Sequence, residues 1–153
     1  MDVGRSINPA IDYGQIEGAF VQGQGLFTME ESLWTQSGQL ATRGPGNYKI
    51  PGFCDIPQEF NVSFLQGVGW KTLRSIQSSK GIGEPPLFLG STVLFALRDA
   101  LAFARRERGV KAPLVLDSPA TVEKLRLAVG DELLEKGKAE KKQGERNFFV
   151  TVA

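Results

Sequence analysis

Apolar and polar positions follow a roughly helical period from 10 to 33. Asn8-Pro9 precedes this stretch and supplies a favourable N-cap followed by a proline at the first helical position, which predicts a helix. The stretch is interrupted by Gly14, Gly18, Gly23 and Gly25. Each glycine costs about 1 kcal/mol relative to alanine in a helix interior. We therefore expect another helix or a cofactor to approach this backbone closely.

Two later stretches, 87–108 and 121–134, also predict helices. The first is apolar on nearly every side at its beginning, which is typical of a buried helix. Arginines near its end suit the negative end of the helix dipole, and Gly109 is a plausible residue just past that end. The second is amphipathic and follows Ser118-Pro119, again a cap residue before a proline. The apolar start of the first helix needs more partners than the short strands of this chain obviously supply.

Between 59 and 65 the pattern changes to alternation of apolar and polar residues, the period of a strand with one buried face. Phe60, Val62 and Phe64 would face a core, and the polar residues between them would face solvent. A short apolar run from 148 to 152 could add an edge strand. The pattern thus predicts an α+β fold in which long helices pack on a small β-sheet.

The chain divides by composition into a globular part and a charged end. Residues 1–134 carry the predicted helices and the best strand, and we expect them to form one domain or part of one. Residues 135–147 are rich in charge and predict a solvated, mobile segment. Residues 148–153 then form the predicted C-terminal strand.

Composition narrows the possible partners and sites. The 153 residues are 41% hydrophobic and 23% charged with a net charge of +1, so no global field attracts nucleic acid or an anionic membrane. No apolar run reaches the roughly 18 residues of a membrane span, and we expect neither kind of partner. With no histidine and only Cys54, a side-chain zinc site and an internal disulfide are excluded. A reducing, cytoplasmic compartment fits this cysteine content.

One acidic residue is distinguished by its neighbours. Glu84 follows Gly81 and Gly83, which allow close backbone approach, and precedes Pro85, which favours an extended backbone before it. Its carboxylate would lie near the positive end of the helix predicted from 87. An ionised carboxylate on a rigid loop beside a buried helix suits a general base. The alternative is a solvated glutamate without a role, which is the commoner case in loops.

Several neutral or basic side chains could contribute to the same site. Gln15, Gln22 and Gln24 lie in the glycine-interrupted helix, and an amide can both donate to a cofactor atom and accept from a ring N–H. Their alternative interpretation is an ordinary polar face. Lys80 could bind an anion near Glu84 or could simply be solvated.

Four blocks of sequence together resemble the molybdenum hydroxylases, the xanthine dehydrogenases and aldehyde oxidases. They are Asp-Val-Gly-x-Ser-Ile-Asn-Pro-Ala-Ile-Asp-x-Gly-Gln-Ile-Glu-Gly-Ala-Phe-Val-Gln-Gly at 2–23, Thr-Arg-Gly-Pro at 42–45 with Tyr-Lys-Ile-Pro at 48–51, Ser-Ser-Lys-Gly-Ile-Gly-Glu-Pro-Pro-Leu-Phe-Leu at 78–89 and Asp-Ser-Pro-Ala-Thr at 117–121. The blocks occur in the family's order. The resemblance implies the C-terminal part of the molybdopterin-binding domain.

The resemblance also implies a mechanism. In that family a molybdenum ion is held by a pterin and carries a hydroxide, from which a glutamate removes the proton. That glutamate falls on Glu84, which makes it the expected catalytic base. The family's cofactor-contacting glutamine falls on Gln15, and Gln22 is a weaker candidate for a pterin contact. The metal would bind through molybdopterin, so no side-chain metal ligand is expected.

The most favoured member of the family is xanthine dehydrogenase, which oxidises hypoxanthine and xanthine to urate in purine catabolism. The alternative is an aldehyde oxidase acting on aldehydes and N-heterocycles. A third possibility, of another class, is an inactive remnant or partner-binding module. The resemblance implies FAD and 2Fe–2S clusters in upstream parts, a homodimeric full enzyme, and dependence on the rest of the same polypeptide. We therefore expect the isolated chain to be inactive.

Overall fold

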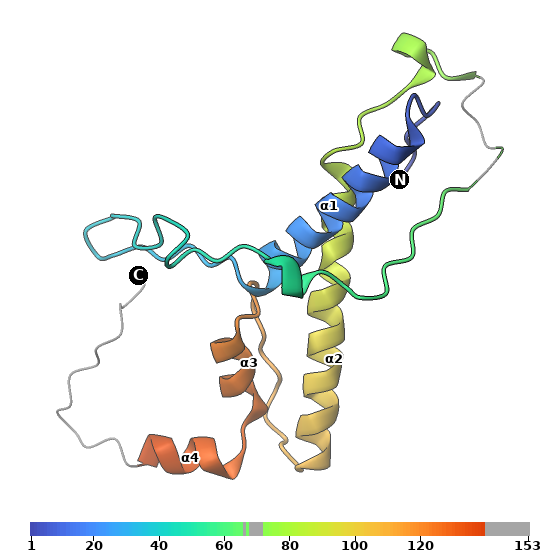
Figure 1. Cartoon of the computed structure of the whole chain (residues 1–153). Helices are drawn as coiled ribbons and strands as arrows, with labels where there is room; N and C mark the ends of the chain where they lie inside the picture. The colour runs from blue at the N-terminus through green and yellow to red at the C-terminus, as the bar shows by residue number, and fades with distance from the viewer. Residues whose placement is uncertain (66, 68–71, 140–153) are drawn as a thin grey trace.

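The computed structural model describes residues 1–65, 67 and 72–139 as helices joined by extended segments (Figure 1). In chain order the elements are α1 (Pro9–Thr28), η1 (Phe53–Asp55), η3 (Ile76–Ser78), η4 (Pro85–Gly90), α2 (Ser91–Glu107), α3 (Val122–Val129) and α4 (Glu132–Ala139). The η elements are short 3-10 helices. In Figure 1, η4 runs directly into α2, and α1 lies against the beginning of this rod.

The predicted α+β fold is only partly confirmed, because the described residues contain helices but no β-sheet. Two isolated bridges, Gly4–Ser79 and Trp34–Leu40, are the only strand-like pairings within them. The small sheet on which the helices were expected to pack is therefore absent from this part of the chain. The predicted edge strand at 148–152 lies outside the described residues.

Residues 59–65 alternate between partly buried and exposed side chains as predicted, but they do not pair with a neighbouring strand among the described residues. Phe60 and Phe64 are partly buried and lie on α1, with ring centroids 5.2 Å from Phe20 and 4.8 Å from Tyr13. Alternation with a period of two requires one face to be covered, but it does not specify whether a strand or a helix covers it. Here the apolar face of this segment packs on a helix.

Helix α1 begins as its cap predicts and ends earlier than its pattern predicts. The Asn8 side chain accepts a hydrogen bond of 3.1 Å from the Ala10 N–H, and Pro9 occupies the first helical position. The helix ends at Thr28 rather than near 33. It is continuous through all of its glycines, so these residues do not break it.

The predicted helix from 87 to 108 is present, with a 3-10 turn at its start. The α-helical part begins only at Ser91, and the end is as predicted, because Gly109 follows with φ +69°. The expectation that its apolar start is buried is wrong within this chain. The side chains of Phe88 and Phe95 are 72% and 56% exposed, and Leu89 is 49% exposed.

By length and composition alone, the helix from Pro85 to Glu107 is apolar enough to cross a membrane, with a mean hydropathy of 1.6 over its best window. The expectation that no apolar stretch is long enough for a membrane span is thus wrong by this test, although the helix contains Arg98 and Asp99. The core helix of a soluble protein passes the same test but is mostly buried, whereas 17% of this window is buried. Its apolar surface therefore needs a cover, whose nature composition does not decide.

The predicted helix from 121 to 134 is instead two short helices. Gly130 adopts the left-handed conformation at φ +67° and ends α3, after which α4 begins. The N-cap is Thr121, whose hydroxyl accepts from the Lys124 N–H at 3.3 Å, and not Ser118. The start of the predicted mobile segment 135–147 belongs to α4, and its remainder lies outside the described residues.

Helix α3 is attached to both long helices. The Lys124 ammonium lies 2.7 Å from the Glu31 carboxylate, and the Ala120 N–H donates to the Phe27 carbonyl at 2.8 Å. On the other side, the buried Arg105 of α2 donates to the Ala128 carbonyl near the end of α3. These contacts hold α3 between the end of α1 and the far half of α2, as Figure 1 shows.

Candidate functional site

Two backbones approach each other closely where α1 crosses η4. Gly23 and Gly90 are both buried there, and Pro86 of η4 is fully buried. A Cβ atom placed on Gly90 would lie 2.6 Å from the Gly23 Cα, so the two backbones touch without side chains between them. The sequence expectation of a close approach is confirmed at this position, and the approaching element is a helix.

Glu84 is the N-cap residue of η4, immediately before its two prolines. Its carbonyl accepts the Leu87 N–H at 3.0 Å, and its side chain is exposed. The extended backbone expected before a proline is wrong here, because Glu84 has φ −100° and ψ −37°. A 3-10 turn needs a carbonyl directed along the helix axis at this position, and that requirement prevails over the local preference of a residue before proline.

Two of the predicted site residues, Glu84 and Gln22, are brought together. Both line an open surface depression of about 580 Å³, whose other walls are Pro85, Leu87 and Phe88. Gln22 comes from α1 and the other residues come from the start of η4, so the α1–η4 crossing builds this depression. Within the described part of the chain, no hydrogen bond or ion pair engages either the Gln22 amide or the Glu84 carboxylate.

Gln15 lies on the same face of α1 as Gln22, because seven residues make almost two full turns of an α-helix. It is not part of the depression, but its amide lies beside the residue that precedes Glu84. A Cβ atom placed on Gly83 would be 3.0 Å from the Gln15 Oε1. Gln15 therefore borders the Glu84 loop from the side of α1.

Gln24 has a structural contact instead of a place at the depression. Its amide nitrogen donates to the Asp55 carbonyl at 2.9 Å and so connects α1 to η1. This is the ordinary polar role that the sequence left open for it. Cys54, next to Asp55, is exposed and free rather than packed.

The segment before Glu84 is attached to the N-terminal residues. The Arg5 N–H donates to the Ser78 carbonyl at 2.6 Å, and the Lys80 N–H donates to the Val3 carbonyl at 3.0 Å. The Lys80 ammonium also donates to Asp2 at 2.6 Å. This hydrogen bond, with one from the Gly4 N–H, holds the pKa of Asp2 below its usual value.

Lys80 is exposed, as the solvated alternative expects, and its ammonium pairs with Asp2 rather than binding an anion at Glu84. Sequence reasoning missed this connection, since the two partners are 78 positions apart. A positive φ of +67° at Gly4 accompanies the pairing, and a side chain there would overlap Leu73 and the Ser78 carbonyl. Glycine adopts positive φ without strain, so Gly4 was a local signal of a turn at this point of the chain.

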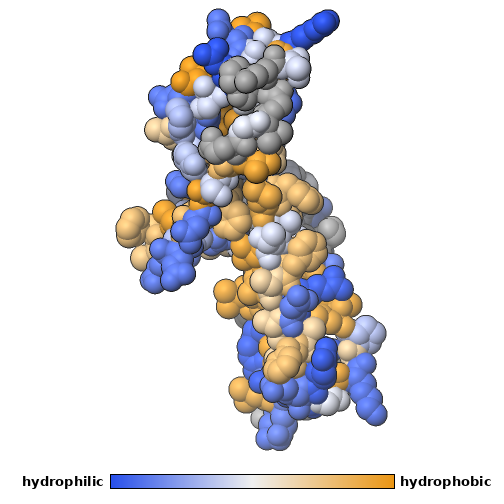
Figure 2. Space-filling model, turned by 90° about the vertical axis from the view of Figure 1, so that its right-hand side faces the viewer, coloured by the Kyte–Doolittle hydropathy of each residue, from blue (hydrophilic) through white to orange (hydrophobic). Residues whose placement is uncertain are grey.

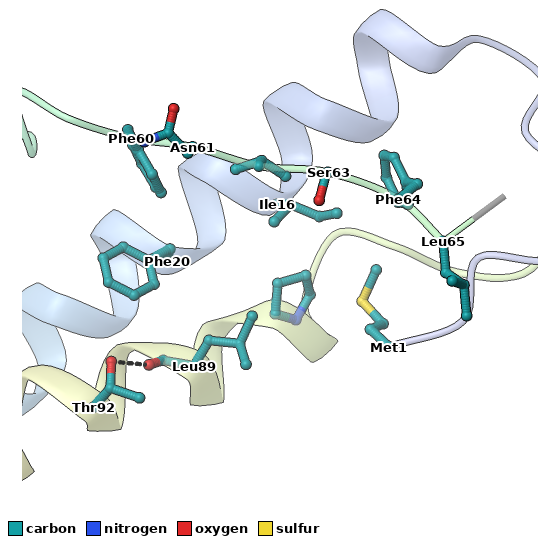
Figure 3. Close-up of a pocket in the computed structure, with 12 residues that line it drawn as sticks. Met1, Ile16, Phe20, Phe60, Asn61, Ser63, Phe64, Leu65, Leu89 and Thr92 are labelled. Atoms are coloured by element: carbon teal, nitrogen blue, oxygen red, sulfur yellow. Dashed lines mark hydrogen bonds between the residues drawn. The ribbon is translucent and has the colours of Figure 1, made fainter.

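A second concave surface, shown in Figure 3, has a different character. It is a groove of about 610 Å³ lined by Met1, Ile16, Phe20, Phe60, Asn61, Val62, Ser63, Phe64, Leu65, Pro86, Leu89 and Thr92. The Thr92 hydroxyl is already bonded to the Leu89 carbonyl at 2.8 Å. The lining contains no acidic or basic side chain, in contrast to the depression at Glu84.

The donor set at the depression suits an organic cofactor better than a bare metal ion. Among the residues that the structure describes, no cluster of three cysteine, aspartate or glutamate side chains could hold a metal ion. Gln15 and Gln22 offer exposed amides, and Glu84 offers an exposed carboxylate. Such amides hydrogen-bond the polar atoms of a cofactor, which would carry its own metal.

Comparison with known proteins gives the same indication. Residues 1–57 match the family model of the molybdopterin cofactor-binding domain. The chain is 73% identical over its full length to a nicotinate hydroxylase of Emericella nidulans, and covers 10% of that protein. It is 61% identical over 99% of its length to a xanthine dehydrogenase of the same organism, of which it covers 11%.

A solved structure is also similar. Quinoline 2-oxidoreductase from Pseudomonas putida 86 matches with a TM-score of 0.67 and 29% sequence identity, over 84% of this chain and 15% of that one. The chain spans about a tenth of the length of the two relatives from Emericella nidulans. With the family model, these similarities show that the chain belongs to the molybdenum hydroxylase family and includes part of its molybdopterin-binding domain.

Proposed function

We propose that this chain supplies one side of the active site of a molybdenum hydroxylase, with Glu84 as the general base. The observation that carries the proposal is the shared depression of Glu84 and Gln22. A carboxylate and an amide border one open space there, and neither side chain is used for packing or pairing in the described chain. An unengaged carboxylate beside a rigid backbone is suited to accept a proton.

The roles of the three side chains follow from their chemistry. The Glu84 carboxylate accepts a proton from the oxygen nucleophile that attacks the substrate. The Gln22 and Gln15 amides hydrogen-bond polar atoms of the cofactor, each as donor or acceptor. When bound, the molybdenum–molybdopterin group supplies the redox centre that takes two electrons from the substrate carbon.

The site needs surfaces that the described residues of this chain do not provide. The depression is open, and α2 exposes large apolar side chains, among them Phe95 and Phe103. Figure 2 shows apolar residues gathered over the middle and lower part of the molecule, where α2 runs in Figure 1. Because the related enzymes are about ten times longer, we propose the rest of such a polypeptide as the partner. FAD and iron–sulfur clusters, a homodimeric assembly and a cytoplasmic location belong to the same proposal.

We propose an electron-poor nitrogen heterocycle as the substrate. The names of the similar proteins include nicotinate, xanthine and quinoline. The identity of 73% to the nicotinate hydroxylase, against 61% to the xanthine dehydrogenase, favours a nicotinate-type ring over the purine expected from the sequence. Xanthine dehydrogenase activity is therefore the second candidate, ahead of aldehyde oxidation.

The test is a chimaeric enzyme in which these residues replace the homologous 10% of the Emericella nidulans nicotinate hydroxylase. In the chimaera, Glu84→Gln removes the proton acceptor with almost no change of shape. We expect kcat to fall by about 10²- to 10⁴-fold, the usual contribution of a general base, with the molybdenum content unchanged. Initial rates and metal analysis of the purified enzyme measure both.

Glu123→Gln is the matched control, because Glu123 is exposed on α3, and its rate should equal that of the unsubstituted chimaera. A Glu84→Gln enzyme that retains full activity with full molybdenum content would exclude the assigned role. Assays of the chimaera with nicotinate, hypoxanthine and an aldehyde then rank the substrate classes. A preference for the aldehyde would contradict the heterocycle proposal.

A further inference from the structure

We infer that Gly23, Gly90 and Gly83 are positioning residues that set the distance of Glu84 from the amides of Gln22 and Gln15. The inference rests on the proposed function of Glu84 and goes beyond it by naming what fixes the geometry of the site. None of the three glycines lines the depression itself. Each lies where one side of the site touches the other.

The first contact point is the crossing of α1 with η4. A Cβ atom on Gly23 would overlap the Leu87 carbonyl oxygen and lie 3.2 Å from the Gly90 Cα. In the other direction, a Cβ atom on Gly90 would lie 2.5 Å from the Gln24 nitrogen. All of these neighbours are backbone atoms, which cannot rotate away as a side chain can.

The crossing is directly joined to the site on both sides. Gln22 immediately precedes Gly23, and Leu87 forms a wall of the depression three residues after Glu84. A methyl group at the crossing must therefore separate α1 from η4, and the separation widens the gap between Gln22 and Glu84. A displacement of about 1 Å can cost about 100-fold in rate when a site depends on aligned groups.

The second contact point is Gly83 against Gln15. A Cβ atom on Gly83 would lie 3.0 Å from the Gln15 Oε1, the far end of a flexible side chain. Such an atom can move by a few tenths of an ångström, so the expected disturbance is smaller here than at the crossing. It also acts on a different amide, so this position tests the inference independently of the helix packing.

Two glycines of the same helix provide internal controls. Nothing lies within 4 Å of a Cβ atom placed on Gly14 or Gly18, although both belong to α1. Alanine at these positions changes helix propensity in the same way as alanine at Gly23, but it presses on no described neighbour. The comparison therefore separates the effect of spacing from the effect of adding a methyl group to the helix.

The experiment compares Gly23→Ala, Gly90→Ala, Gly83→Ala, Gly14→Ala and Gly18→Ala in the chimaeric enzyme. Molybdenum content, thermal stability, kcat and KM are measured for each variant. For the crossing variants that load molybdenum, we expect kcat to fall by about 100-fold with KM nearly unchanged. For Gly83→Ala we expect a fall of roughly 10-fold, since 3.0 Å requires only a small shift. Gly18→Ala should stay within about twofold of the unsubstituted chimaera, whereas Gly14 adjoins Gln15 and its alanine variant is compared in thermal stability alone.

The crossing variants could fail to fold, and Gly83→Ala then decides the question, because its neighbour can yield. A merely structural role of Gly83 would lower thermal stability without lowering kcat at full molybdenum content. A folded, molybdenum-loaded Gly90→Ala or Gly83→Ala enzyme with the kcat of Gly18→Ala would overturn the inference. Failure of the proposed function is distinguished by Glu84→Gln, which would then keep its rate whatever the glycine variants do.

Discussion

The α1–η4 crossing and the exposed face of α2 are opposite in how they are packed. At the crossing, Gly23, Gly90 and Pro86 are buried and the backbones touch. Along α2, Phe95 and Phe103 are 56% and 57% exposed. Both regions are apolar, so hydrophobicity alone does not explain the difference.

The difference shows which contacts the chain makes for itself. The elements that carry Gln22 and Glu84 are held together by this chain alone, through backbone contact that no other surface needs to supply. The apolar side chains of α2 have few partners among the described residues, and large exposed apolar surfaces usually mark an interface. The described residues therefore set the geometry of the site among themselves, whereas the exposed apolar side chains of α2 need a partner outside the described residues.

The largest expected effect comes from studying the chain in isolation. We expect no molybdenum-dependent turnover of nicotinate, hypoxanthine or an aldehyde, because the open depression supplies only one side of a site. We also expect the isolated chain to bind a hydrophobic dye, and Phe95→Ser with Phe103→Ser to lower that binding by roughly half. Enzyme assay and dye fluorescence measure the two outcomes.

Phe20→Ser is the control for the dye experiment, because Phe20 packs on Phe60 at 5.2 Å rather than facing solvent. It should raise dye binding or leave it unchanged. An isolated chain that turns over substrate would show that its site is already complete. A chain that binds no dye would show that α2 is already covered. The comparison between the two regions would then be wrong.

A smaller effect is expected at the connection between α2 and α3. Arg105 is only 8% exposed and donates to the carbonyls of Ala128, Ala112 and Pro113, the last at 3.4 Å. Arg105→Ala leaves these carbonyls without their donor, at a cost of about 2–3 kcal/mol for bonds to a charged group. Amide exchange in α3 should accelerate by about 30- to 100-fold, as measured in the chimaera.

Arg106→Ala is the matched control, since Arg106 is adjacent and exposed. It should leave exchange in α3 unchanged. Equal exchange in the two variants would mean that α3 depends on Lys124 and Glu31 rather than on Arg105. The far half of α2 would then lack its firmest described attachment.

The smallest effect concerns the ion pair between Asp2 and Lys80. Hydrogen bonds from Lys80 and from the Gly4 N–H lower the pKa of Asp2 from its usual 3.8. A carboxyl with a lowered folded-state pKa stabilises the folded form above the unfolded value, and this contribution disappears as pH falls through the lowered pKa. The ion pair should therefore persist above about pH 4 and be lost in more acidic solution.

An NMR titration of the Asp2 carboxyl in the chain measures this effect. The midpoint should lie below 3.8 and should return toward 3.8 in Lys80→Gln. A midpoint that is the same in both proteins would show that Lys80 does not stabilise the Asp2 carboxylate. Because both side chains are largely exposed, a small influence on the Glu84 loop is expected.

Much of the local structure could be predicted from the sequence. The Asn8 cap, the helix end at Gly109 and the partly buried face of 59–65 all appear in the structure. These features depend on capping residues, on backbone preference and on periodicity, all of which involve residues close together in the sequence. The roles of Glu84, Gln15 and Gln22 stay predictions, although the structure brings Glu84 and Gln22 to one depression.

Contacts between distant segments could not be predicted from the sequence. It did not distinguish Gly23, which meets η4, from Gly14 and Gly18, which meet nothing. It expected a sheet partner for 59–65, where the structure places α1, and an extended backbone at Glu84, where it places a turn. It also gave no sign that Arg105 is buried against three carbonyls.

The sequence by itself determined where α1 begins and where α2 ends, which residues prefer burial, and which family's motifs the chain carries. Only the tertiary structure decided which glycines are spacers, what covers each apolar face, and that Gln22 and Glu84 meet. The physical reason is that capping and periodicity act over a few residues along the chain. The distance between α1 and η4, by contrast, is fixed by steric contact between residues 67 positions apart, Gly23 and Gly90.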